Sequence, residues 1–322
     1  MRSARLIVSF AIVVIVASSA AAQTVGIGTS AQGSITYSIG ATVAKIITEQ
    51  VGVQTRVQPR GGNSVVVPAV NAGEVDFGVS NVVELADALA GTGIYQGQQL
   101  SSLRVLTVLM PTRVGLFVQK DSPIKSIRDL RGKRVPGAWT TMKSVELTVA
   151  GLLANGGLGW SDVKIVSVPN VVRGADDFAQ GKTDVLFFAL GTAKVLEVNA
   201  TVGGLRLLPI DPSPEAMARM RKHFPSAYAE TLAPSEEHPG VLGPTPVTAF
   251  DFLLLTNSKV PDDLIFKVTK ALYEGKGSML ASFKELGSLF SPQTMAKNLA
   301  AGEYHPGAIK FYREKGLWPP KE

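Results

Sequence analysis

The chain has no cysteine and only three histidines among its 322 residues. Without cysteine there is no thiol nucleophile, no thiolate metal site and no cysteine-linked cofactor. His223, His238 and His305 belong to no H-x-x-E-H or H-E-x-x-H motif, so a histidine-rich metal site is not expected. A chain of this length builds a core large enough to fold without disulfides in an oxidising compartment. We expect no metal and no cofactor.

Charged residues are also few, at 18% against 45% hydrophobic residues, as in ordinary globular proteins. The formal net charge is +6, and Lys and Arg are scattered except in the cluster 128–134. This distribution gives no support for nucleic-acid binding. A mildly basic protein is suited instead to an anionic solute.

The one long apolar run lies at the N-terminus. Arg2 and Arg5 precede the apolar residues 6–16, and three alanines at 20–22 supply a cleavage signal. The run is too short for a permanent membrane anchor, no twin arginine is present, and no cysteine follows it for a lipid anchor. We expect residues 1–22 to be a signal peptide cleaved near Ala22, which predicts a periplasmic protein that does not span the membrane.

The stretch 25–37 has the pattern of strand, small polar loop and helix. Glycines in the loop let the backbone approach a ligand closely, and the first turn of a helix presents unpaired N–H groups that favour an anion. The helix that follows has an apolar face at helical spacing, formed by Ile39, Val43, Ile46 and Ile47. The pattern predicts a site for a small carboxylate or phosphate, with a tight turn that binds nothing as the alternative.

Two nucleotide-binding motifs are incomplete in this loop. Gly26, Gly28 and Ala31 fit the dinucleotide fingerprint loosely, but the next strand, 54–59, carries no acid to hold a ribose. The spacing of Gly28 and Gly33 is that of a P-loop, but the lysine is missing. Neither nucleotide site is favoured.

Residues 25–89 predict the order β-α-β-α-β-α, which indicates a parallel sheet with right-handed crossovers. Ligands bind outside the carboxyl ends of such strands. Each of the three strand ends carries small or uncharged hydrogen-bonding residues. They are Thr29, Ser30, Gln32 and Gly33 at the first, Gly62, Asn63 and Ser64 at the second, and Ser80 and Asn81 at the third.

The same strand, loop and helix recur at 137–144, so two lobes each direct a polar loop at the other. Trp139 in this second loop is either a stacking wall for the solute or a core residue, and Thr140 and Thr141 follow it. Arg113 and Lys143 are the candidate cations for a carboxylate, with a solvated surface position as the alternative for each.

Two segments connect the lobes. Residues 103–109 and 114–118 predict two strands separated by a break at Pro111, and 247–256 predicts a long strand that crosses back. Residues 122–130 predict a short helix capped by Ser122, and His305 precedes Pro306 as a structural cap. Two crossings suit closure around a ligand.

Several motifs together resemble a known family. They are Ile27, Gly28 and Thr29 with Gly33 and Tyr37, then Gly61 and Gly62, then 73–78, 124–134 and 305–312. Over residues 25–317 the chain resembles the TAXI-type solute receptors of the tripartite ATP-independent periplasmic (TRAP) transporters. Such receptors deliver small carboxylates to a membrane permease driven by an ion gradient.

The resemblance implies a class II periplasmic-binding-protein fold, α/β and two-lobed. Each lobe is expected to be a mostly parallel sheet flanked by helices, with two hinge strands between lobe 1 (23–115 and 248–322) and lobe 2 (116–247). It implies first-lobe ligand contacts at Thr29, Ser30, Gly33 and Tyr37, with Asn63 and Ser64 matching the polar residues after the Gly-Gly pair.

Two departures change the expected ligand. The second-lobe loop contains Trp139 instead of only Gly, Ser and Thr, and Val65 and Val66 replace a Glu-Asn pair. These changes favour a bulkier or less polar organic acid over glutamate. We expect a monomeric binding protein. A receptor that reports its ligand to a membrane signalling protein, or an enzyme on the same fold, is the alternative, although no nucleophile or acid–base pair stands at the strand ends.

Overall fold

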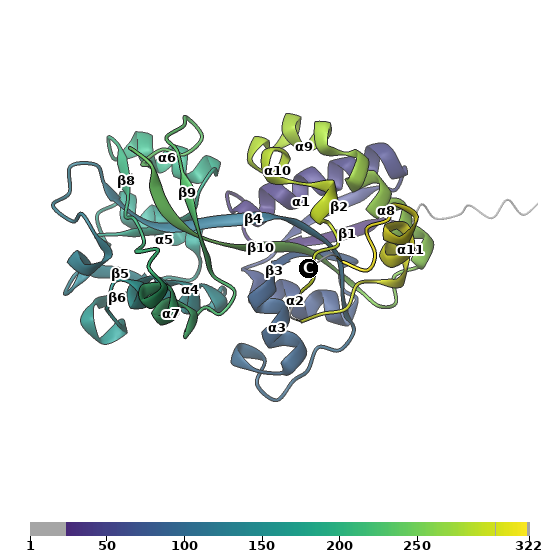
Figure 1. Ribbon diagram of the computed structural model, residues 1–322, viewed down its shortest axis with the longest axis horizontal. Coiled ribbons are helices and arrows are strands. Elements are labelled where there is room, and N and C mark those ends of the chain that lie inside the picture. Colours follow the sequence, from purple (N-terminus) through teal and green to yellow (C-terminus); the bar gives the residue numbers. More distant parts are fainter. Residues whose placement is uncertain (1–23, 300, 321–322) are drawn as a thin grey trace, which may run out of the picture.

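The computed structural model describes residues 24–299 and 301–320. The expected signal peptide, 1–22, lies outside the described residues. The fold is α/β and two-lobed, as the sequence predicts, and two long strands, β4 (Leu103–Gln119) and β10 (Thr245–Asn257), run from one lobe into the other (Figure 1). In the described part of the chain, no helix has both the length and the apolar character needed to cross a bilayer.

Lobe 1 is built on three parallel strands, β1 (Val25–Thr29), β2 (Thr55–Pro59) and β3 (Phe77–Asn81), in the order β2-β1-β3. Their crossover helices are α1 (Ile35–Ile46), extended by a π-helical turn (Ile47–Val51), and α2 (Asn63–Ala72). Helix α3 (Val82–Ala90) and a 3-10 turn (Gly93–Tyr95) lead into β4. Every residue of β1 and β3 is buried, as expected for central strands with both faces covered.

Lobe 2 surrounds the far halves of the two crossing strands. Strands β7 (Leu186–Ala189) and β8 (Leu205–Leu207) pair with β4, and β9 (Tyr228–Leu232) pairs with β10. A separate parallel pair consists of β5 (Arg134–Gly137) and β6 (Lys164–Ser167). The expectation of mostly parallel pairing therefore holds for β1–β3 and for β5–β6. β4 and β10 pair antiparallel with each other and with every strand named here, so the large sheet is mixed.

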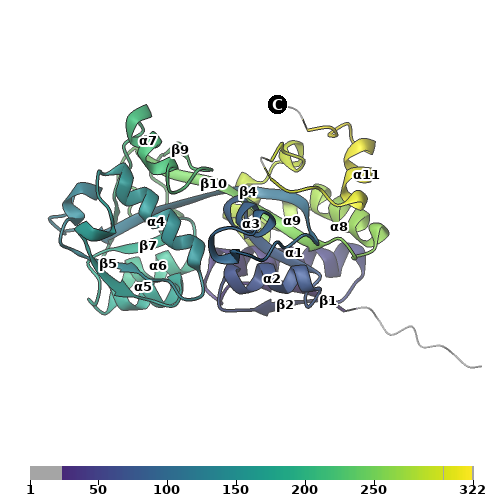
Figure 2. The same cartoon turned by 90° about the horizontal axis from the view of Figure 1, so that it is seen from below.

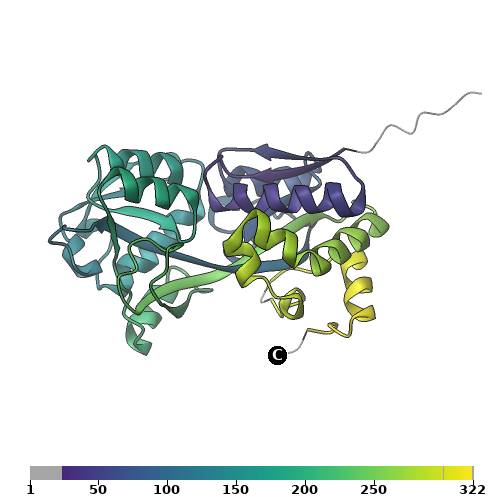
Figure 3. The same ribbon diagram turned by 90° about the horizontal axis from the view of Figure 1, so that it is seen from above.

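The remaining elements cover these sheets. Lobe 2 has α4 (Lys143–Asn155), α5 (Val171–Ala179), α6 (Ala193–Thr201), α7 (Pro214–Arg221) and 3-10 turns at Ile127–Leu130 and Trp160–Asp162. After β10 the chain returns to lobe 1 and forms α8 (Asp262–Glu274), α9 (Lys276–Ser282), α10 (Lys284–Leu289), a 3-10 turn (Pro292–Thr294) and α11 (Pro306–Glu314). Of these C-terminal helices, α8 and α9 lie beside α1, and α11 packs against α8 (Figures 2 and 3).

Two local predictions differ from the structure and one is confirmed. The break predicted at Pro111 is wrong, because β4 is continuous there and Pro111 lies opposite Asp251 of β10. The helix predicted to start at Ser122 is also wrong, because only a 3-10 turn forms and Ser126 caps it. The structural role predicted for His305 is confirmed, since its Nδ1 accepts a hydrogen bond from the Gly307 N–H at the start of α11.

Candidate functional site

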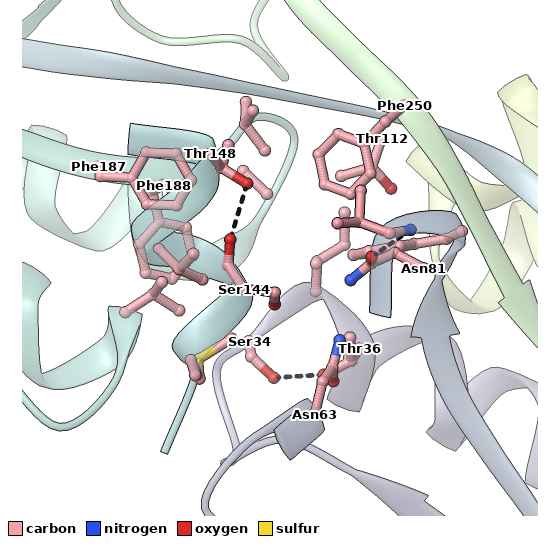
Figure 4. A pocket seen from close by; sticks show the side chains of 18 residues that line it. Ser34, Thr36, Asn63, Asn81, Thr112, Ser144, Thr148, Phe187, Phe188 and Phe250 are labelled. Atoms are coloured by element: carbon pink, nitrogen blue, oxygen red, sulfur yellow. Dashed lines mark hydrogen bonds between the residues drawn. The ribbon is translucent and has the colours of Figure 1, made fainter. Parts of the chain in front are cut away.

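A cavity of about 60 Å³ lies between the lobes (Figure 4). Lobe 1 contributes the N-termini of α1, α2 and α3, and lobe 2 contributes α4, α5 and β7, while β4 and β10 form the wall between them. Its polar lining consists of Ser34, Thr36, Asn63, Asn81, Thr112, Ser144 and Thr148. Among the described residues, no Asp, Glu, Lys or Arg side chain lines the cavity.

The first turn of α1 forms one polar side of the cavity. Ser34 is the N-cap, and its Oγ accepts a hydrogen bond from the Tyr37 N–H over 3.2 Å. The Thr36 Oγ1 accepts from the Ser30 N–H, which ties the loop after β1 to the helix. The N–H groups of Ile35 and Thr36 have no partner within the described part of the chain. The positive end of the α1 dipole therefore faces the cavity.

Asn63 and Asn81 each have an occupied amide oxygen. The Asn81 Oδ1 caps α3 by accepting from the N–H groups of Val83 and Glu84, at 3.0 and 2.9 Å. The Asn63 Oδ1 accepts from the Ser30 hydroxyl at 3.2 Å. Both side chains line the cavity and are 3% and 5% exposed. The Asn81 oxygen accepts two hydrogen bonds and the Asn63 oxygen one of its two, while the NH₂ group of each side chain, which can only donate, remains for a ligand.

Thr112 adds a donor from the crossing strand β4. The residue is 0% exposed, it lines the cavity, and its Oγ1 has no hydrogen-bond partner within the described residues. A buried hydroxyl without a partner costs stability, because it has lost its hydrogen bonds to water. A ligand acceptor placed in the cavity is a partner that this hydroxyl can reach. Figure 4 shows Thr112 beside Phe250 on the side of the cavity opposite Ser144.

The other walls of the cavity are apolar, with four phenylalanines. Phe187 and Phe188 come from β7, and Phe250 and Phe252 come from β10. Edge-to-face packing holds them in place. The Phe250 ring centre lies 5.6 Å from that of Phe252 and 4.9 Å from that of Phe224 behind it.

The nearest charged groups are paired or buried outside the lining. The Arg113 guanidinium contacts the carboxylates of Glu230 at 2.7 Å and Glu285 at 3.6 Å. Glu84 is 1% exposed and accepts hydrogen bonds from the hydroxyls of Ser64 and Tyr95. Burial raises the pKa of the Glu84 carboxyl, which favours its neutral form.

The predicted site residues fall into distinct groups. Asn63 and Asn81 line the cavity, and Ser30 hydrogen-bonds Asn63 from behind. Thr29 is buried in β1, where its hydroxyl bonds the Ser30 carbonyl oxygen. Gln32 is exposed and Gly33 is half-buried in the loop after β1. Tyr37 lines a separate groove, of about 580 Å³, between α1, α6 and α10.

The second-lobe residues lie outside the lining as well. Trp139 is 0% exposed and packs behind Phe187, with ring centres 6.2 Å apart. Thr140 is exposed. The Lys143 N–H donates to the Ser64 Oγ at 3.0 Å, so both residues contribute to the contact between the lobes instead of the cavity wall. On β4, the Arg113 guanidinium is held by the carboxylates of Glu230 and Glu285.

Sequence reasoning missed most of the lining. Ser34 and Thr36 stand inside the stretch 25–37 that it singled out, and the N-cap signal could have found Ser34. Thr112 fell in the break predicted between two strands. The four phenylalanines stand in apolar strands, which are typical of a core, and no local pattern distinguishes them.

The two lobes also contact each other directly. The Thr141 hydroxyl donates to the Gly61 carbonyl oxygen at 2.9 Å. Any Cβ added at Gly62 would lie 2.0 Å from the Thr141 carbonyl oxygen. Glycine at this position therefore permits the close approach of the lobes.

Several solved structures share the fold of this chain. A periplasmic transporter structure matches with a TM-score of 0.59 and 17% identity, covering 84% of this chain and 89% of that one. The amino acid ABC transporter substrate-binding protein AbpA from Streptococcus pneumoniae, bound to L-arginine, matches with a TM-score of 0.52 and 15% identity, covering 82% and 94%. The alkanesulfonate-binding protein SsuA from Xanthomonas axonopodis pv. citri, bound to MOPS, matches with a TM-score of 0.51 and 16% identity, covering 92% and 94%.

These identities establish a shared fold. A family model describes nearly the whole chain, matching residues 27–316. The match includes β1 at one end and α11 at the other, and so both lobes. The chain belongs to the NMT1-like family.

Proposed function

We propose that the protein is an extracytoplasmic solute-binding protein that captures a small organic anion between its lobes. The observation that carries the proposal is the excess of donors without acceptors in the cavity lining. The NH₂ groups of Asn63 and Asn81, the Thr112 hydroxyl and the N–H groups at the start of α1 all converge there. A carboxylate only accepts hydrogen bonds, so it satisfies such a set, and hydrogen bonds to a charged acceptor are the stronger ones.

Helix dipoles favour the same charge. The N-termini of α1, α2 and α3 meet at the cavity, and each carries a partial positive charge. With no charged side chain in the lining, these backbone groups set the local potential. Arginine is therefore not needed to neutralise the anion, and we propose no direct ligand contact for Arg113 or Lys143.

Binding and closure are coupled in this proposal. The cavity of about 60 Å³ has room for a few water molecules, so the lobes separate to admit a solute. The moving bodies are lobe 1 (23–115 and 248–322) and lobe 2 (116–247), with β4 and β10 as hinges. A solute that touches both lobes stabilises the joined arrangement, because only that arrangement makes contacts from both sides.

We further propose that the protein is a periplasmic monomer that binds without catalysis and hands its solute to a membrane permease of the TRAP type. The TAXI-like motifs support this partner, and the relatives with the same fold are binding proteins of transporters. AbpA belongs to an amino acid ABC transporter, which makes an ABC-type permease the competing partner.

The test uses the mature protein purified gently enough to retain its solute. Native mass spectrometry should show an added mass that denaturation releases as an organic anion, and calorimetry should show saturable binding of that compound. Absence of binding across a broad set of organic acids would overturn the proposal. Co-expression with candidate TRAP and ABC permeases, followed by uptake of the labelled solute, separates the two partners.

A further inference from the structure

Resting on the proposed function, we infer that the solute is a compact monocarboxylate with a branched or single-ring apolar body and no ammonium group. The inference comes from the composition of the cavity lining. Lobe 1 and Thr112 offer hydrogen-bond donors, lobe 2 adds the hydroxyls of Ser144 and Thr148, and most of the remaining wall is apolar, including Phe187, Phe188, Phe250 and Phe252. A solute that matches this lining has one acceptor group and a hydrocarbon body.

The apolar side gives no partner to a second charged group. An α-amino acid needs a carboxylate or several carbonyl acceptors for its ammonium, and a dicarboxylate needs donors at both ends. Val114, Val145 and the phenylalanines supply neither, and the only polar side chains that lobe 2 adds to the described lining are the uncharged hydroxyls of Ser144 and Thr148. Burying an unpaired charge against such a surface costs several kcal/mol, so these solutes are selected against.

The charged groups close to the cavity cannot fill that role. Arg113 is engaged by Glu230 and Glu285 on the other side of β4. Glu84 is held by the hydroxyls of Ser64 and Tyr95 and does not line the cavity. Asp251, on β10, is paired with Lys297 and Tyr228. Each of these groups already has its partners inside the protein.

The aromatic part of the wall packs against further aromatic side chains behind it, which fixes its shape. Phe250 is packed between Phe224 and Phe252, and Phe187 rests against the buried Trp139. A wall supported from behind cannot retreat to make room for a long chain. This rigidity limits the solute body to a short branched chain or one ring, and it gives Trp139 a positioning role without contact to the solute.

The inference is tested by calorimetry with matched solutes on the full mature chain. Phenylacetate and 4-methylpentanoate are the expected ligands. L-Phenylalanine and L-leucine add an ammonium group to similar bodies, glutarate adds a second carboxylate, and acetate keeps only the head group. Benzenesulfonate compared with benzoate tests whether a sulfonate can replace the carboxylate. We expect both apolar acids to bind at least about tenfold more tightly than the amino acids, glutarate or acetate.

A substitution tests whether Phe250 contacts the apolar body of the solute. Phe250→Leu should weaken phenylacetate binding several-fold and leave acetate unchanged, while Phe266→Leu, where Phe266 packs against Phe311 away from the cavity, should change neither. Glutamate or glutarate binding more tightly than the apolar acids would overturn the inference and leave the proposed function standing. Failure of every acid to bind would overturn both.

Discussion

The hydroxyl of Thr141 in lobe 2 donates a hydrogen bond to the carbonyl oxygen of Gly61 in lobe 1, over 2.9 Å. The same hydroxyl also lies 2.8 Å from the Pro169 carbonyl oxygen in lobe 2, so Thr141 links the loop at Gly61 to lobe 2. The glycine pair on the opposite side leaves no side chain to keep the loop away. The contact between the lobes therefore depends above all on the absence of a Cβ at Gly62.

Gly62→Ala should hold the lobes apart. The added Cβ would lie 2.0 Å from the Thr141 carbonyl oxygen, and a backbone atom cannot rotate away. Gly62 has φ 173°, which alanine adopts without strain, so lobe 1 should fold normally. We expect an increased radius of gyration by small-angle scattering and about tenfold weaker solute binding.

Gly61→Ala is the matched control for this prediction. Its Cβ would lie 3.0 to 3.4 Å from the side-chain atoms of Thr141, a contact much less severe than the one at Gly62 and one that a small shift of the loop relieves. A smaller effect on both measurements is expected. Equal effects of the two substitutions would show that the backbone contact is not what limits closure.

Asn81→Asp should abolish anion binding while keeping the fold. Aspartate caps a helix as well as asparagine does, so the hydrogen bonds to the Val83 and Glu84 N–H groups survive. The substitution replaces a donor with a negative charge facing the solute. We expect affinity for the anion to fall at least about 100-fold, measured by calorimetry.

The same substitution at an exposed position, Asn298→Asp, should leave affinity within about threefold of the wild-type value. Thermal unfolding of Asn81→Asp should stay close to that of the wild type. Retained affinity in Asn81→Asp would mean that the NH₂ group of this residue does not face the bound anion.

How far the sequence could predict this cavity depends on the kind of residue. Asn63 and Asn81 could be placed because they follow strands, and the carboxyl ends of parallel strands meet at one edge of a sheet. Because a break was predicted at Pro111, the sequence did not indicate on which face of the strand Thr112 and Arg113 lie. In the continuous strand β4, neighbouring side chains point to opposite faces, so Thr112 lines the cavity while Arg113 points to Glu230 and Glu285.

The aromatic side could not be predicted for a different reason. Phe187 and Phe250 stand in strands whose residues are all or nearly all buried, and burial alone does not tell core from cavity wall. Their position depends on how lobe 2 docks against lobe 1, which is a property of the tertiary fold. For Trp139 the sequence left both a stacking wall and a core position open, because a loop position says nothing about which way a large side chain turns.

Trp139→Ala should destabilise the protein more than it affects head-group recognition. The indole is fully buried against Phe187, and removing such a side chain typically costs about 3–5 kcal/mol of unfolding free energy. Thr140→Ala, at the exposed neighbouring position, should cost less than about 0.5 kcal/mol. Chemical denaturation measures both. If Trp139→Ala left stability unchanged and removed acetate binding, the tryptophan would be a direct contact after all.

Glu84→Gln should flatten the dependence of stability on pH. Burial raises the pKa of the Glu84 carboxyl above its ordinary 4.5, against smaller opposing effects of hydrogen bonds from Ser144, Tyr95 and Ser64. The folded state thus holds this proton more tightly than the unfolded state does. The stability that results is fully present below about pH 4.5 and is lost as the pH rises through the raised pKa.

The wild-type free energy of unfolding should therefore decline as the pH rises above about 4.5. The free energy of unfolding of Glu84→Gln should decline less, because glutamine has no proton to lose. Denaturant titrations from about pH 4 to about pH 8 measure the difference, and the exposed Glu274→Gln serves as the control. Ser144 belongs to lobe 2 and Glu84 to lobe 1, so ionisation of the carboxyl also changes a contact between the lobes. Parallel pH profiles for the wild type and Glu84→Gln would show that this buried carboxyl does not titrate between the two states.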